Sequence, residues 1–268
     1  DSSEFGLALG EALRKHGLAF FLPGSTQAAK VLSQMAPALR SMGARAIVPE
    51  WNAWNRVRGH STEDLAQQAG ILAVKTWPAP ANAEHPLLLD LAATPVFLLM
   101  DHEGRYRRAF DAWEAVRARE SLAKNSDKVS LAVCAPQEHF EVCLIADAAG
   151  RAKAASCVRV LASDNNARPW MVASIENATL LEQATRLAST LALQGPLHLQ
   201  FTRYEGLFYL IDWQPGFPVW IEISHAAGPD LVSLSLEPDA FATGALPPTT
   251  PANLLFSQTA EDHVLIPK

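Results

Sequence analysis

The chain has 268 residues, of which 49% are hydrophobic and 19% are charged, and its formal net charge is −6. This length can bury a substantial core in one large domain or in two to three smaller ones. The negative charge and the lack of a basic run argue against nucleic acid as a main partner. The longest apolar runs fall far short of the roughly 20 residues that a membrane-spanning helix needs, so we expect no membrane association.

The cysteines and the first residue give two further expectations. Cys134, Cys143 and Cys157 have no metal-ligand spacing and are odd in number, which predicts a protein of the reducing cytoplasm. The sequence opens at Asp1 rather than at methionine, and we expect that further residues precede it in the complete protein.

The first 50 residues alternate between helical and strand patterns. Apolar spacing predicts a helix over 4–16, and Ser25 or Thr26 can cap a second helix that ends before Gly43. Residues 18–22 are predicted to form a buried strand, and residues 44–48 a second strand. This order favours right-handed crossovers and a parallel sheet whose first strand lies upstream of residue 1.

The next 100 residues contain shorter predicted elements. Ser61 or Thr62 caps a short helix over 61–69, residues 71–80 form a linker, and residues 95–100 form a strand. A helix over 110–124 is predicted to bury Trp113 and Val116. Further strands are expected at 129–135, 140–146 and 153–161.

A strong helix and a hairpin follow. Residues 177–193 carry an apolar stripe of helical spacing, formed by Leu180, Leu181, Ala184, Leu187, Ala188 and Leu191. Residues 197–203 and 207–213 read as two strands joined by a turn that contains Gly206. Side chains alternate along a strand, so Asp212 and Gln214 share one face, with Tyr209, Ile211 and Trp213 on the other.

A three-residue turn would add Gln200 to the polar face of this hairpin, and His198 would share it. One acid and two amides would then cluster at the end of the hairpin. A lone histidine in this place is more often half-buried than functional. The histidines elsewhere in the sequence show no metal-binding spacing.

The hairpin and the residues after it resemble the end of an ATP-grasp domain. Asp212-Trp213-Gln214-Pro215-Gly216 stands where that family usually has Glu-Ile-Asn-Pro-Arg, followed here by Phe-Pro-Val-Trp and Ala-Ala-Gly. The resemblance covers most of the chain and implies an α/β region followed by an α+β region with antiparallel sheets. It implies a partial, parallel pre-ATP-grasp-like domain at 1–76, a small ATP-grasp lobe at 77–136 and a large lobe at 137–268 that contains the 197–214 hairpin.

The resemblance also implies a site for ATP and Mg²⁺. Asp212 would be the principal magnesium ligand, and Gln200 and Gln214 would be weaker oxygen donors. Arg159 would contact phosphate or substrate as the catalytic residue. Gly104 and Arg105 would belong to the loop that closes over ATP.

The sequence departs from the family at several nucleotide-binding positions. The two expected lysines fall near Leu99 and near Gly59 and His60, and the expected hinge glutamate falls near Val133. Gly104 is the only glycine of the loop, and Gly216 replaces the arginine of the motif. Each departure removes charge or backbone access that ATP phosphates need.

Two functions therefore stay open. One is an ATP- and magnesium-dependent carboxylate-amine ligase, which converts a small-molecule or peptide carboxylate to an acyl phosphate and lets an amine displace the phosphate. The other is a non-catalytic relative that serves as a binding or scaffold subunit with a partner protein or a second copy of the chain. An unrelated α+β protein with a fortuitous match is a third interpretation.

Overall fold

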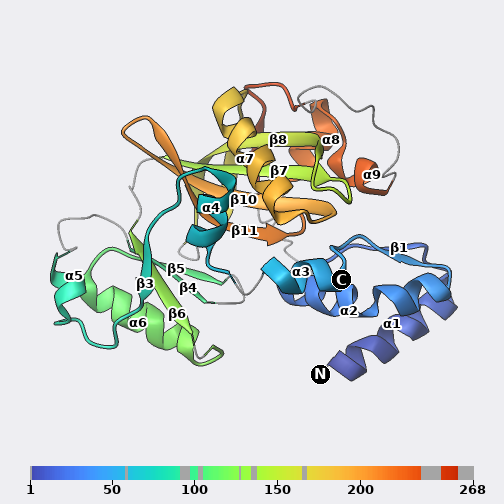
Figure 1. The fold of residues 1–268 in the computed structure, drawn as a ribbon, viewed down its shortest axis with the longest axis horizontal. Helices are drawn as coiled ribbons and strands as arrows, with labels where there is room; N and C mark the ends of the chain where they lie inside the picture. The colour runs from blue at the N-terminus through green and yellow to red at the C-terminus, as the bar shows by residue number, and fades with distance from the viewer. Residues whose placement is uncertain are drawn as a thin grey trace, which may run out of the picture.

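A computed structural model describes residues 2–57, 60–90, 97–101, 105–126, 128–133, 138–164, 168–236 and 249–258. In these residues the strands form three sheets of two, four and six strands (Figure 1). No helix within these ranges is both long and apolar enough to cross a bilayer.

The opening layer contains a parallel pair of very short strands. Phe20 pairs with Arg45 and Phe21 with Ala46, so the predicted parallel layer is confirmed only in part. Phe20 is 41% exposed, and the prediction that this strand is buried is wrong. The Ser25 hydroxyl caps the long helix by accepting from the Ala28 amide at 3.1 Å. The elements are α1 (Ser2–His16), β1 (Phe20–Phe21), α2 (Thr26–Ser41), β2 (Arg45–Ala46) and α3 (Trp51–Val57).

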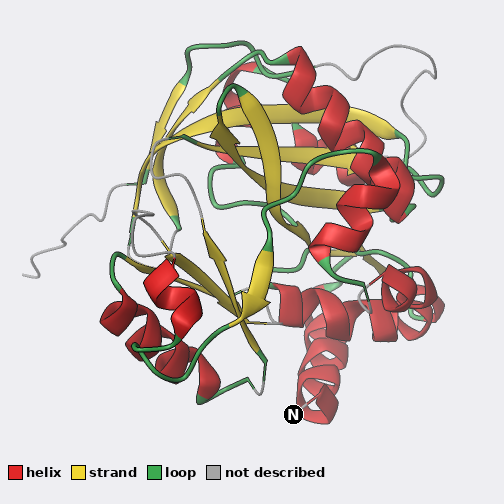
Figure 2. Ribbon diagram, turned by 60° about the vertical axis from the view of Figure 1, so that its left-hand side comes forward, coloured by secondary structure: helices red, strands yellow, loops and turns green. Residues whose placement is uncertain are grey.

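The small sheet is antiparallel, with α5 and α6 on one side (Figures 1 and 2). Helix α6 buries Ala115, Ala118 and Leu122 against the strands. Trp113 is 67% exposed, so its predicted inward position is wrong; only Val116 lies partly against the core. The elements are β3 (Thr76–Pro78), α5 (Pro86–Asp90), β4 (Phe97–Asp101), β5 (Tyr106–Ala109), α6 (Ala112–Ala123) and β6 (Val129–Val133), in the sheet order β3-β6-β4-β5.

The large sheet is also antiparallel and carries helices on both faces. Helices α4 and α7 cover one face, and α8 and α9 pack on the other. Its elements are β7 (His139–Ala146), β8 (Ala152–Ser163), β9 (Pro169–Ser174), β10 (Gly195–Tyr204), β11 (Leu207–Pro215) and β12 (Leu255–Ser257), in the sheet order β11-β10-β7-β8-β9-β12. The helices are α4 (Thr62–Ala69), α7 (Ala178–Leu191), α8 (Glu222–Ala227) and α9 (Leu231–Leu236).

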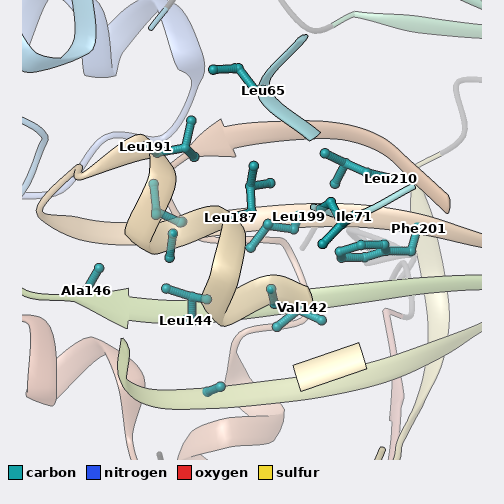
Figure 3. Close-up of a cluster of buried hydrophobic side chains, with 14 of the residues drawn as sticks. Leu65, Ile71, Val142, Leu144, Ala146, Leu187, Leu191, Leu199, Phe201 and Leu210 are labelled. Atoms are coloured by element: carbon teal, nitrogen blue, oxygen red, sulfur yellow. The ribbon is translucent and has the colours of Figure 1, made fainter. Parts of the chain in front are cut away.

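Helix α7 confirms the predicted apolar stripe. All six stripe residues are buried, and the Asn177 side chain caps the helix by accepting from the Leu180 amide at 2.9 Å. Leu187 and Leu191 lie over Leu144 and Leu199 of the sheet (Figure 3). The antiparallel sheets confirm the predicted α+β character, whereas the domain boundaries at residues 76 and 136 stay predictions.

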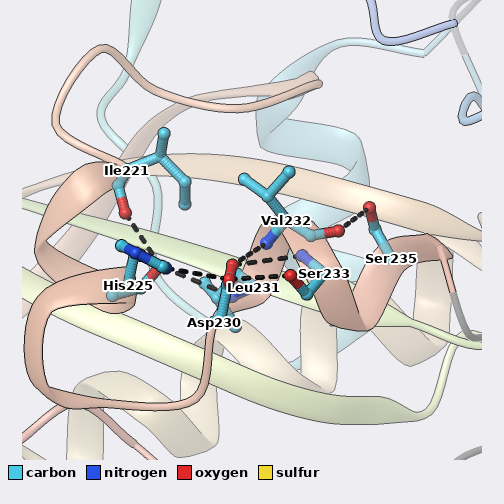
Figure 4. A network of polar contacts seen from close by, with 8 residues as sticks. Ile221, His225, Asp230, Leu231, Val232, Ser233 and Ser235 are labelled. Atoms are coloured by element: carbon cyan, nitrogen blue, oxygen red, sulfur yellow. Dashed lines mark hydrogen bonds and ion pairs between the residues drawn. The ribbon is translucent and has the colours of Figure 1, made fainter.

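A polar network joins α8 to α9 on the other face (Figure 4). Asp230 Oδ1 accepts from the amides of Val232 and Ser233, both at 3.1 Å. Its Oδ2 accepts from the Ser233 hydroxyl at 2.7 Å and lies 2.9 Å from His225 Nδ1. Burial alone would raise the pKa of Asp230, but the hydrogen bonds from Ser233 and His225 outweigh it and lower this pKa to about 2. Asp230 thus caps the start of α9 and connects α9 to α8 through His225.

The turn of the 197–214 hairpin has two residues rather than the predicted three. Tyr204 pairs with Leu207, and the turn residues Glu205 and Gly206 have φ values of 48° and 82°. Two successive positive φ angles are typical of the tight turn whose twist matches that of the strands, and glycine adopts such an angle without strain.

A β-bulge at Ile211 restores the predicted polar face. A straight ladder from a two-residue turn would place Gln200 opposite Ile211, and Asp212 would then face the other side of the sheet. Instead the register passes from Phe201–Leu210 to Gln200–Asp212 and skips Ile211. The common face of Gln200 and Asp212 is therefore confirmed, but by a bulge that we did not predict.

The same bulge corrects the predicted positions of Tyr209 and Ile211. Tyr209 pairs with Thr202, which lies two residues from Gln200 and therefore on the same face of β10. Ile211 packs against residues of the small sheet. The bulge thus turns an apolar side chain toward the neighbouring lobe immediately before Asp212.

Candidate functional site

Five polar side chains share one face of three neighbouring strands. Gln200 lies opposite Asp212 on β11 and opposite Glu141 on β7, and His198 lies opposite Gln214. Directly opposed residues of an antiparallel pair point to the same face. The strand register therefore assembles Glu141, His198, Gln200, Asp212 and Gln214 without help from loops.

Glu141 is a buried carboxylate surrounded by donors. Its side chain is 5% exposed, and Oε2 accepts a short hydrogen bond from the indole of Trp220 and lies 2.9 Å from His198 Nε2. Oε1 accepts a longer bond from Gln200 Nε2 at 3.4 Å. A buried carboxylate costs little only when such donors satisfy it. Sequence reasoning missed Glu141, although a glutamate inside the apolar run 140–146 was a signal for it.

A second hydrogen-bonded group joins three parts of the molecule; we call Thr26, Tyr106, Asp212 and Gln214 the latch. Asp212 Oδ2 accepts from the Tyr106 hydroxyl, and it also accepts from Gln214 Nε2 at 3.2 Å. Gln214 Oε1 accepts from the Thr26 hydroxyl at 3.0 Å. Thr26 begins α2 and Tyr106 begins β5, so the opening layer and the small sheet both meet the hairpin here.

Burial sets the protonation of the latch. It raises the pKa of Asp212, and the hydrogen bonds from Tyr106 and Gln214 offset this only in part. Burial, followed by the charge of Asp212, raises the pKa of Tyr106 well above its usual value. The Tyr106 hydroxyl therefore keeps its proton and donates to Asp212 at neutral pH.

Two cavities lie on either side of the latch. The face cavity, of about 410 Å³, is lined by Glu141, His198 and Gln200 of the large sheet, together with Tyr106 and Arg105. The edge cavity, of about 360 Å³, is lined by Asp212 and other residues of β11, by α2 and by the small sheet. Thr26 and Gln214 line both cavities, so the latch separates them.

The predicted metal ligands share a face but form different pairs. Asp212 and Gln214 bond to each other, whereas the side chain of Gln200 bonds to Glu141. Arg105 lines the face cavity and forms an ion pair with Asp101 at 2.5 Å. Gly104 lies outside the described residues.

Arg159 does not lie beside the predicted metal ligands. It pairs in register with Phe140, which belongs to the core under α7, so Arg159 lies on the opposite face from Glu141. Its side chain is exposed. Its catalytic role stays a prediction without a described contact to the cluster.

No lysine occupies the expected positions near the cavities. Leu99 is 1% exposed and packs toward α6, while Leu98 and Met100 lie on the side of β4 that faces the hairpin. His60 lines the edge cavity. Gly59 and residues 134–137, where the family has its hinge, are outside the described part of the chain, and so is the side chain of Val133.

The described side chains do not fit a magnesium ion in this arrangement. Within the described ranges, no group of three or more His, Cys, Asp or Glu side chains is placed to hold a metal. Mg²⁺ would have to displace the Tyr106 hydroxyl from Asp212, and Gln214 turns its amide nitrogen rather than its oxygen toward this carboxylate. Magnesium requires several oxygen ligands in near-octahedral geometry, which the latch does not offer.

No protein-family model and no curated protein matches the sequence. Among solved structures, the biotin carboxylase domain dimer of the 2-oxoglutarate carboxylase from Hydrogenobacter thermophilus, with MgADP, ADP and bicarbonate, matches 89% of this chain at a TM-score of 0.67 and 14% identity. Rhizobium etli pyruvate carboxylase with acetyl coenzyme A matches 88% at 0.66 and 18% identity. The Campylobacter jejuni biotin carboxylase complex with β,γ-ATP matches 89% at 0.65 and 17% identity.

The chain spans only part of these structures, namely 57% of the first, 22% of the second and 58% of the third. At these identities the likeness concerns the fold.

Proposed function

Starting from the ATP-grasp fold, which this chain shares with biotin carboxylase domains, we propose a non-catalytic relative that binds a ligand or partner between its lobes. The observation that carries the proposal is the latch: the only acid at the predicted metal position, Asp212, is bonded to Tyr106 and Gln214. The resemblance of the fold to ATP-grasp domains, first seen in the hairpin, is confirmed. Of the two functions left open by the sequence, we propose the non-catalytic one.

The chemistry of phosphoryl transfer supports this proposal. Transfer from ATP relies on metal ions and cationic side chains that neutralise the phosphates. Asp212 has a raised pKa and is already bonded to donors of the protein, and Glu141 is likewise occupied by Trp220, His198 and Gln200. On the hairpin side of β4, Leu98 and Met100 offer no charge. Each of these features weakens the site for MgATP.

The ligase is the second candidate, and one observation favours it. Gln200, Asp212 and Gln214 do share a face, and Arg105 and Arg107 line the face cavity beside them. If Tyr106 moved away from Asp212, this carboxylate could contact Mg²⁺, while Gln200 and Gln214 would keep their bonds to Glu141 and Thr26. Mg²⁺ would then neutralise phosphate charge, and the arginines would orient an anionic carboxylate substrate.

A titration with MgATP tests the two candidates. We expect wild-type protein to show no saturable heat with MgATP at millimolar concentration, because the latch occupies Asp212. Saturable binding that Asp212→Asn abolishes would contradict the proposal and support the ligase. Tyr106→Phe sharpens the result, since binding gained by this variant alone would show that the hydroxyl is what blocks the site.

The proposed setting is the reducing cytoplasm, with a partner protein or a second copy of the chain. Cys143 and Cys157 are both buried. Burial raises the pKa of both thiols, that of Cys157 to about 12, so they stay protonated and unreactive. Cys134 lies outside the described residues.

Size-exclusion chromatography with light scattering would measure the oligomeric state directly.

A further inference from the structure

The edge cavity runs along an unpaired stretch of strand. Four consecutive residues, Asp212 to Pro215, line it, and because side chains alternate between faces, such a cavity must border the edge of the strand. Strand β11 is the last in its sheet, and within the described ranges the one bridge on its outer side joins Leu210 to Ala73. In the described part of the chain, no strand covers the outer edge of 212–215. Pro215 has no amide hydrogen and the Trp213 amide bonds to Asp212, so the donors for a ligand at this edge are side chains.

Basic side chains from three segments line this cavity. Lys30 comes from α2, Lys128 precedes β6 and His60 precedes α4, so three separate segments direct basic groups to one cavity. Across the described residues, neither lysine has a carboxylate within ion-pair distance.

The two acids in the lining are already engaged from the other side. Asp101 pairs with Arg105 at 2.5 Å, and Asp212 accepts from Tyr106. Arg105 and Tyr106 both line the face cavity and not the edge cavity. Arg105 thus compensates the charge of Asp101, and Asp212 is hydrogen-bonded to the neutral Tyr106 hydroxyl. The two lysines have no carboxylate partner among the described residues, which favours an anion beside them.

Two indole side chains line this cavity and also pack against the core, and Trp54 is 5% exposed. Trp54 and Trp213 both line it, and Trp51 holds Trp54 edge-on with ring centroids 6.3 Å apart. A volume of about 360 Å³ lies in the range of small-molecule sites. The lining therefore combines cationic side chains with indole side chains.

We propose that the edge cavity binds a small organic anion that carries a phosphate or carboxylate group on a flat ring. Lys30 and Lys128 hold the anionic group, and the indoles of Trp54 and Trp213 cover the ring. This site requires neither magnesium nor ATP. It goes beyond the proposed loss of catalysis and does not depend on it.

Calorimetric titration without magnesium or nucleotide tests this site, with phenyl phosphate, benzoate and inorganic phosphate as probes. We expect saturable binding of a ring-bearing anion that is tighter than that of inorganic phosphate. The double variant Lys30→Met/Lys128→Met should weaken it by at least about tenfold, since it removes two charged contacts. Lys124→Met, which makes the same change at an exposed position at the end of α6, is the matched control and should bind like wild type.

Three outcomes would overturn the proposal. One is the absence of saturable binding for all three probes at millimolar concentration. Another is wild-type affinity in the double variant, once its thermal unfolding shows that it is folded. The third is binding that survives in the double variant but disappears in Arg168→Met, because Arg168 lines the face cavity. None of these outcomes bears on MgATP binding, so the two proposals fail separately.

Discussion

The face cavity and the edge cavity share the latch but treat charge in opposite ways. In the face cavity, Trp220, His198 and Gln200 surround the carboxylate of Glu141. In the edge cavity, Lys30 and Lys128 have no such partners among the described residues. A polar group that bonds to other protein groups supports the fold, whereas a charged group without a protein partner is available to a ligand. The comparison assigns a structural role to the first cavity's acid and a binding role to the second cavity's cations.

The largest expected effect tests the structural role of the Glu141 network. Trp220 is 0% exposed, so Trp220→Ala should lower the free energy of unfolding by about 3–5 kcal/mol through the lost packing. It also removes a donor from the buried carboxylate of Glu141. Trp113→Ala makes the same change at an exposed position of α6 and should cost less than about 0.5 kcal/mol. Urea unfolding of both variants measures this difference. Equally small effects in the two variants would contradict a structural role for the Glu141 network.

The latch itself should contribute less. Tyr106→Phe removes the hydroxyl that donates to Asp212 and should destabilise the protein by about 1–3 kcal/mol, because a buried acceptor loses its donor. In a double-mutant cycle with Asp212→Ala, which removes the acceptor, the two effects should not add. Tyr204→Phe, at the exposed hairpin tip, serves as the control and should leave stability unchanged. Additive effects in the cycle would contradict a direct Tyr106–Asp212 interaction.

The pH dependence of stability should reveal the buried position of Asp212. Because burial raises its pKa, the folded state keeps a proton that the unfolded chain has already lost. The stabilising contribution is therefore complete below the unfolded pKa of about 3.9 and is lost as the pH rises through the higher folded pKa. Asp212→Asn cannot titrate, so its stability relative to wild type should improve from about pH 4 toward neutral pH. Parallel pH profiles for the two proteins would contradict this prediction.

The smallest expected effect concerns a carboxylate outside both cavities. Asp230→Ala removes the cap of α9 and should cost about 0.5–2 kcal/mol near pH 7. The pKa of Asp230 is lowered to about 2, so its contribution is present above the unfolded pKa of about 3.9 and is lost as the pH falls through about 2. The gap between wild type and variant should therefore close in acid, the opposite direction from Asp212. Urea midpoints at pH 7 and in acid check this, and a constant gap would contradict it.

Local patterns in the sequence predicted several of the regular elements. The predicted linker 71–80 is wrong in part, because Thr76–Pro78 forms β3 of the small sheet. The apolar stripe of α7 and the cap Ser25 act within a few residues of where they stand, and the structure has them as predicted. The cap Asn177 was not predicted. The stripe of α6 was assigned wrongly, because Trp113 is large and apolar yet lies exposed beside the Ala115–Ala118–Leu122 face. Size and hydrophobicity alone do not define which face of a helix is buried.

The sequence by itself determined the hairpin, the capped helices and the resemblance to the ATP-grasp fold, because turn residues and periodic apolar side chains act on their own neighbourhood. Only the tertiary structure decided that Tyr106 meets Asp212, a contact between residues 106 positions apart, and that a bulge at Ile211 returns Asp212 to the face of Gln200. Contacts between distant segments depend on how whole lobes pack, and no short stretch of sequence encodes that.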